Sequence, residues 1–112
     1  MRIAVPVAAG RMALHFGHCE SFALVDVDPT AATIVDRRDV PAPPHQPGLL
    51  PPWLAGQGVD VIIAGGMGQR AQDLFAAQRI RVLVGASAGS PEELVTGFLK
   101  GTLALGANVC DH

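Results

Sequence analysis

The chain has 112 residues, a formal net charge of −2, 49% hydrophobic residues and 16% charged residues. This length suits one domain, residues 1–112, with a core large enough to be stable without a disulfide or a structural metal. The small negative charge argues against nucleic-acid binding. No apolar run reaches the ~18 residues that a membrane span requires, and Pro6 and Arg11 interrupt the apolar start. We therefore expect a cytoplasmic protein, bound to neither membrane nor nucleic acid, whose two cysteines are reduced thiols.

Apolar runs and turn signals predict alternating strands and helices. In chain order we expect strand Arg2–Val7, loop Ala8–Ser21, strands Phe22–Val27 and Ala32–Val40, a proline-rich connection Pro41–Pro52, a short helix ending at Gly56 or Gly58, strand Val59–Ala64, helix Gln69–Gln78, strand Arg81–Val84, a helix from Ser90 to about Lys100, and a tail Leu103–His112. Ser90, Pro91 and Glu93 have the spacing of a capping box.

The connections between these strands predict the sheet. The short turn at 28–30 favours an antiparallel hairpin, whereas the strand–helix–strand unit at 59–84 requires a right-handed crossover and a parallel pair. The first, fourth and fifth strands are apolar at nearly every position, which is typical of strands covered by helices on both faces. The sequence therefore predicts an α/β fold with a five-stranded mixed sheet and flanking helices.

All histidines and both cysteines fall outside the predicted strands and helices. They are His15, His18, Cys19, His45, Cys110 and His112. Imidazole and thiolate are ligands for zinc, iron, copper and metal–sulfur clusters. Loops after the first, third and fourth strands lead to the edge where open α/β sheets bind ligands, and a ten-residue tail can extend roughly 33 Å back to it. These residues can form one metal site, although a single loop histidine is more often simply exposed and no paired Cys-x-x-Cys is present.

A glycine-rich loop, Gly65, Gly66, Met67 and Gly68, follows the fourth strand and opens a helix. Its backbone N–H groups and the helix dipole could hold an anion, either a phosphate or an anionic cluster. A tight strand-to-helix turn without a ligand is an equally good interpretation, and the full dinucleotide fingerprint is missing.

Patterns that indicate catalysis are weak. Cys19 beside His18 could be an activated thiol, but adjacent residues rarely face each other and no third orienting group is evident. The nucleophile-elbow and Walker motifs are absent from the sequence. We therefore expect a protein that is not an enzyme.

Several motifs together resemble the dinitrogenase iron–molybdenum cofactor biosynthesis family, the NifX/NafY-type carrier domain also found fused to the NifB cofactor synthase. They are the segments Met1–Val7, His15-Phe16-Gly17, Phe22–Val27, Gly58–Gly68 and Asn108–His112. The resemblance implies a ribonuclease-H-like fold without nuclease chemistry, with strand order 3-2-1-4-5 and strand 2 antiparallel. It also implies binding of iron–molybdenum cofactor, its precursors or related clusters, such as the molybdenum–copper sulfide of an orange-coloured relative, and it singles out His15 as a ligand.

Three functional hypotheses remain open. The first is a carrier of a metal–sulfur cluster of the iron–molybdenum or molybdenum–copper type, with cluster donor and acceptor proteins as partners and a monomer or weak homo-oligomer as the assembly. The second is a domain that binds a single zinc or iron ion through the same ligands. The third is a small-molecule or nucleotide-binding module that uses the glycine loop.

Overall fold

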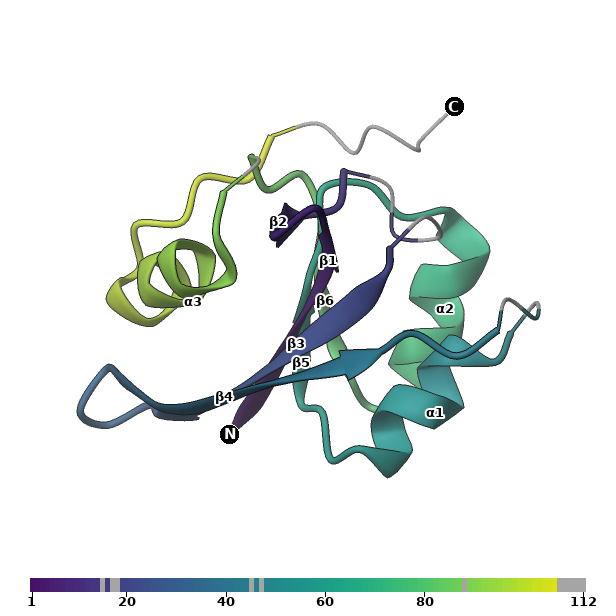
Figure 1. Ribbon diagram of the computed structural model, residues 1–112, viewed down its shortest axis with the longest axis horizontal. Coiled ribbons are helices and arrows are strands. Elements are labelled where there is room, and N and C mark those ends of the chain that lie inside the picture. The colour runs from purple at the N-terminus through teal and green to yellow at the C-terminus, as the bar shows by residue number, and fades with distance from the viewer. Residues whose placement is uncertain (15, 17–18, 45, 47, 88, 107–112) are drawn as a thin grey trace.

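The computed structural model describes residues 1–14, 16, 19–44, 46, 48–87 and 89–106. Within them a mixed sheet carries three helices (Figure 1). The elements are β1 Arg2–Ala8, β2 Arg11–Met12, β3 Ser21–Asp28, β4 Thr33–Pro41, α1 Leu50–Gly56, β5 Val61–Ile63, α2 Gln69–Ala77, β6 Arg81–Leu83 and α3 Pro91–Lys100. None of the described helices is long and apolar enough to cross a membrane.

The sheet has the order β4-β3-β1-β5-β6. β1 pairs with β5 and β5 with β6 in parallel, whereas β3 runs antiparallel to both β1 and β4. These five strands follow the predicted order, including the antiparallel second member. Their arrangement brings the carboxyl ends of β1, β4, β5 and β6 to one edge of the sheet. We call this edge the carboxyl edge.

The prediction of five strands is wrong, because the described residues form a sheet of six. β2 pairs antiparallel with β1 through Val7↔Met12 and Ala8↔Arg11. The two residues between them, Ala9 and Gly10, have φ angles of 53° and 79°, the left-handed values that close a two-residue hairpin. The segment expected to be a loop therefore begins with a hairpin, hidden in the sequence because alanine seldom takes a left-handed conformation.

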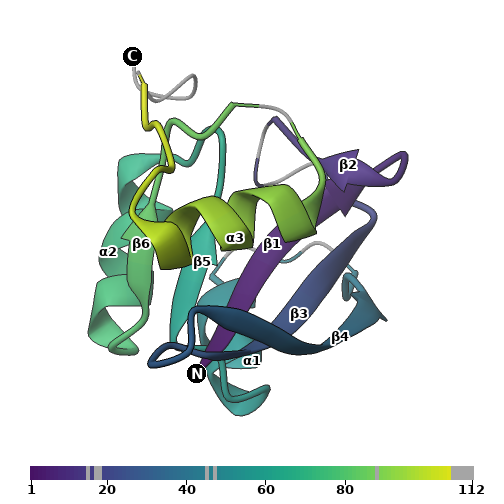
Figure 2. The same cartoon turned by 90° about the vertical axis from the view of Figure 1, so that its left-hand side faces the viewer.

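Helices cover both faces of the sheet, as the apolar strands predicted (Figure 2). Alternate residues of β1 supply the two halves of the core. Ile3 and Val5 pack in the cluster that contains Val95 of α3. Ala4 packs in the other cluster, with Leu54 of α1 and Phe75 of α2. Both halves of the core thus consist of apolar side chains, and no polar or charged residue is buried among the residues that the structure describes.

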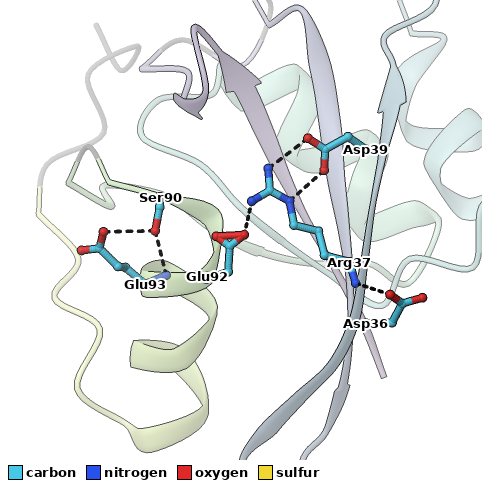
Figure 3. A network of polar contacts seen from close by, with 6 residues as sticks. All are labelled: Asp36, Arg37, Asp39, Ser90, Glu92 and Glu93. Atoms are coloured by element: carbon cyan, nitrogen blue, oxygen red, sulfur yellow. Dashed lines mark hydrogen bonds and ion pairs between the residues drawn. The ribbon is translucent and has the colours of Figure 1, made fainter.

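Arg37 ties the outer strand β4 to the start of α3 (Figure 3). Its guanidinium donates to both carboxylate oxygens of Asp39, at 2.8 and 2.9 Å, and to Glu92 in the first turn of α3. Hydrogen bonds to Asp39 and then to Glu92 raise the pKa of Arg37, so it is always charged. The ion pairs therefore link the β3–β4 hairpin with the first turn of α3.

The predicted cap by Ser90 is confirmed at the start of α3, with Glu93 bonded to the Ser90 hydroxyl. The Ser90 hydroxyl accepts a hydrogen bond from the Glu93 backbone N–H at 3.2 Å and donates to the Glu93 carboxylate at 3.1 Å (Figure 3). Pro91 occupies the first helical position, where its missing N–H has no cost.

We expect Ser90→Ala to lower the free energy of unfolding by about 1 kcal/mol, because the first turn of α3 loses its side-chain acceptor. Urea denaturation of the metal-free protein measures the change. Ser90→Asp keeps an acceptor at the same position and serves as the control, which should stay close to wild type. Equal losses in both variants would mean that the cap contributes nothing.

Candidate functional site

The loop after β1 is anchored at the carboxyl edge by Phe16. Its ring is buried and packs edge-on against Phe75, with 5.4 Å between centroids, and at a tilt against Phe22 at 6.0 Å. Its backbone N–H donates to the carbonyl oxygen of Gly66 at 3.0 Å. The histidine-rich loop is therefore fixed at its middle to the loop that follows β5. His15 and His18, on either side of this anchor in the sequence, lie outside the described residues.

The same two loops touch a second time at Gly65. A Cβ atom at this position would lie 2.9 Å from the carbonyl oxygen of Leu14 and 3.3 Å from the terminal methyl of Met12. Real Cβ atoms do not approach a backbone oxygen so closely, so only glycine permits this packing. The contact brings the loops after β1 and β5 together at the predicted edge.

The four residues of the glycine loop have different surroundings. Gly65 and Gly66 are buried under the loop after β1, and the Met67 side chain lies in the core between the sheet and helices α1 and α2. Gly68 is exposed and is the N-cap residue of α2. Gly65 thus serves close packing, and the Gly66 carbonyl accepts the hydrogen bond from Phe16. The predicted anion site stays a prediction. Of the four residues of this loop, Gly68 at the start of α2 is the one exposed to a possible anion.

The loop after β6 and the tail join the same edge. Gly85 donates its N–H to the Gly65 carbonyl at 2.9 Å, and its own carbonyl accepts from the N–H of Gly106 at 2.7 Å. Ala86 and Leu105 form an antiparallel bridge beside this contact. The described part of the tail therefore returns to the carboxyl edge. Cys110 and His112, which follow it in the chain, lie outside the described residues.

Cys19 is the predicted metal ligand whose place the structure gives. It is half-buried and packs against the core cluster that contains Phe16 and Phe22. Burial raises the pKa of its thiol to about 11. The metal-free protein therefore holds Cys19 as a neutral thiol at physiological pH, which makes it a poor nucleophile, and a metal ion would have to displace its proton.

Backbone hydrogen bonds place the residue after Cys19 between β1 and the proline-rich segment. The N–H of Glu20 donates to Val7 at 2.8 Å, and the Glu20 carbonyl accepts from Ala42 at 3.1 Å. The proline-rich segment thus starts next to the histidine–cysteine loop. His45, which belongs to this segment, lies outside the described residues.

The structure thus brings together the segments that carry the predicted ligands. Among the residues that it describes, no three His, Cys, Asp or Glu side chains are grouped closely enough to hold a metal ion. Sequence reasoning missed Phe16 as an anchor and Gly85 as a contact between loops. A phenylalanine between histidine and glycine in a predicted loop, and a glycine directly after a predicted strand, are the signals that could have revealed them.

The structure defines the class of protein as an α/β domain whose carboxyl edge consists of loops from neighbouring strands and a returning tail. Residues 1–101 match the family described as dinitrogenase iron-molybdenum cofactor, and the chain belongs to this family. No curated protein matches the chain in sequence.

Solved structures share the fold over almost the whole chain. The protein PH0822 is 26% identical and superposes with a TM-score of 0.86, with 94% of each chain covered. The apo form of the orange protein from Desulfovibrio gigas is 27% identical with a TM-score of 0.72, covering 96% of this chain and 93% of its own. A protein of Methanocaldococcus jannaschii, 16% identical with a TM-score of 0.74 and 96% coverage of both chains, shows the fold alone.

We expect Gly65→Ser to lower the free energy of unfolding by about 1–3 kcal/mol, because the added side chain meets the Leu14 carbonyl and forces the two loops apart. Gly68→Ser is the matched control. A Cβ at Gly68 meets nothing within 4 Å, and serine is a good N-cap residue, so its stability should be unchanged or slightly higher. Chemical denaturation of both variants measures the free energy of unfolding. Equal stability of the two variants would show that the loops can separate without a loss of stability.

A second expectation concerns Cys19 in a Cys110→Ser background. Its thiol should react with iodoacetamide at pH 8 at least about tenfold more slowly than in guanidinium, because the folded protein suppresses the thiolate. The rate in the folded protein should keep rising with pH up to about 11. Equal rates in folded and unfolded protein would contradict a raised pKa.

Proposed function

We propose that the protein binds and carries a metal–sulfur cofactor, either iron–molybdenum cofactor, its precursor, or a related molybdenum, iron or copper cluster, and that it catalyses no reaction. Membership of the dinitrogenase iron-molybdenum cofactor family over residues 1–101 is the observation that carries this proposal. The anchored loop supports it, since Phe16 holds the histidine–cysteine segment at the edge where α/β sheets bind ligands.

In this proposal Cys19 and His15 are the central ligands, helped by His18, His45, Cys110 or His112. A thiolate with imidazoles suits soft and borderline metals in sulfide clusters. Because Cys19 is half-buried, a metal bound to its thiolate would have limited contact with water. An anionic cluster would also be favoured by the positive end of α2 at Gly68.

Further parts of the proposal follow from the family resemblance and the composition. They are the ribonuclease-H-like classification of the fold, a cytoplasmic location, donor and acceptor proteins for the cluster, and a monomer or weak homo-oligomer. A single zinc or iron ion on the same ligands is the main alternative. Phosphate or nucleotide binding at the start of α2 is the other alternative.

Anaerobic titration with three probes separates these alternatives: tetrathiomolybdate with copper, ferrous iron with sulfide, and zinc. We expect a coloured complex, whose metal and sulfide content elemental analysis gives. Cys19→Ser and His15→Ala should each lower the affinity by at least about tenfold while leaving the melting temperature of the apo-protein nearly unchanged, because a ligand stabilises the protein only when metal is present.

Val35→Ser is the control for these variants, since Val35 lies on β4 and is 69% exposed. Zinc binding without any coloured complex would favour the mononuclear alternative. Stabilisation by phosphate with no metal bound would favour the nucleotide module. Unchanged affinity for every probe in both point variants would exclude the loop as the site.

A further inference from the structure

The chain leaves α3 through a sharp reversal and then returns to the loop after β6. Gly101 ends the helix with a φ of 72°, and Thr102 and Leu103 both donate their N–H groups to the Gly97 carbonyl, at 2.8 and 3.1 Å. This is the Schellman type of helix end, which reverses the direction of the chain. We call residues 101–106 the return segment.

The far end of the return segment is fixed at Gly85. The Gly85 carbonyl accepts the N–H of Gly106, and Ala86 forms a bridge with Leu105. The φ angle of Gly85 is 87°, and a Cβ atom there would lie 2.1 Å from the carbonyl oxygen of Gly106. Glycine is therefore required at this position, and the return segment is held at both of its ends.

Between these ends the return segment encloses a hollow against the sheet. The hollow has a volume of about 430 Å³ and is lined by Arg81 and Leu83 of β6, Phe98 and Gly101 at the end of α3, and Leu103 and Leu105 of the return segment. This volume lies within the range of small-molecule sites, roughly 300–1,000 Å³.

The walls of the hollow are mainly apolar and partly open to water. Leu83, Phe98 and Leu103 are half-buried and pack against the core, whereas Leu105 is 46% exposed. Among the described residues β6 is the last strand on this side of the sheet, so no further strand fills the space. An apolar group placed here would remove these walls from water and bind through the hydrophobic effect.

Arg81 is the charged residue of the lining. Its guanidinium carbon lies 5.8 Å from the centre of the Phe98 ring, a cation–π distance. The ion pairs found in the described part of the chain involve Arg2 and Arg37, and none of its carboxylates pairs with Arg81. The end of α3 at Gly101 carries roughly half a negative charge against the full positive charge of the guanidinium, so the hollow keeps a positive charge.

We propose that this hollow binds a small amphipathic carboxylate, that is, a carboxylate group attached to a branched aliphatic or aromatic body. The planar guanidinium of Arg81 donates two parallel hydrogen bonds to the carboxylate, and the Phe98 ring limits the directions that the guanidinium can take. The body lies against the apolar walls. The site needs no metal and is independent of the proposed cluster binding.

A ligand in the hollow also stabilises the docked return segment. Leu103 and Leu105 form part of the wall, so the ligand binds the docked arrangement better than an undocked one. The hydrogen bond from Gly106 to Gly85 should therefore open less often when the hollow is occupied.

Hydrocinnamate is the probe for the test, and hydrocinnamide, which has the same body and no charge, is its control. Backbone amide chemical shifts of the isotope-labelled, metal-free protein give the dissociation constant and the place of binding. The variants are Arg81→Gln, which removes the charge, and Leu105→Ser, which removes part of the wall. Arg79→Gln is the matched control, because Arg79 is an exposed cation two residues away that does not line the hollow.

We expect hydrocinnamate to bind with a dissociation constant on the order of 1 mM, with the largest shifts in β6, the end of α3 and the return segment. Hydrocinnamide should bind at least about threefold more weakly. Arg81→Gln should abolish this difference, and Arg79→Gln should keep it. Leu105→Ser should weaken both ligands by about threefold, because both lose the same apolar contact.

Hydrogen exchange of the Gly106 amide tests the effect on the return segment. At ten times the dissociation constant of hydrocinnamate, exchange should slow by about tenfold if the ligand binds only the docked arrangement. An unchanged exchange rate in the saturated protein would contradict the stabilisation of the return segment by the ligand.

Three results overturn the proposed site. One is equal affinity of the wild-type protein for hydrocinnamate and hydrocinnamide. Another is a loss in Arg79→Gln as large as that in Arg81→Gln, which would mean attraction by the general positive field of the surface. The third is the absence of shifts around the hollow at ten times the expected dissociation constant, in protein whose spectrum shows an intact fold.

Discussion

Backbone packs directly against backbone along the carboxyl edge of the sheet, and glycine is required at two positions for this to happen. Leu14 lies on Gly65, which bonds to Gly85, which in turn bonds to Gly106. Each step joins a different loop, so four segments distant in sequence form one continuous layer. A side chain at either glycine would separate a segment that carries candidate ligands from the others. The arrangement of the candidate site therefore depends on contacts in which none of the predicted ligands takes part.

Much of the fold could be predicted because its signals are local. The apolar run of β1, the helix cap at Ser90 and the strand–helix–strand unit at β5–β6 each depend on residues close together in the chain. The β1–β2 hairpin could not be predicted, because Ala9 has a positive φ angle, which is unfavourable for alanine. Pairing of β2 with β1 and the bond from Met12 to Gly89 stabilise that conformation from outside the turn.

The sequence predicted at which edge of the sheet the candidate site lies, but it predicted the roles of the individual residues less well. Strand order alone placed the loops after β1 and β5 at one edge, and the contact of Phe16 with Gly66 agrees. A glycine that exposes backbone to a ligand and a glycine that admits a neighbouring loop look identical in sequence. Gly65 belongs to the second kind, and only the position of Leu14 reveals it. Likewise, the high pKa of Cys19 comes from burial beside the core, which no neighbouring residue in the sequence indicates.

The protonation of Cys19 bears on how a carrier could release its cargo. The two core clusters of aliphatic and aromatic side chains close without a metal ligand among their buried members, so binding energy at the edge is separate from folding energy. In the empty state burial keeps Cys19 as a neutral thiol. A thiolate left there without its metal would be a poorly solvated anion, which is costly. Proton uptake removes this cost when the metal leaves. Under the proposed function, the burial that lowers affinity for a cluster at neutral pH also makes the empty site stable, so the cluster can pass to an acceptor without unfolding the carrier.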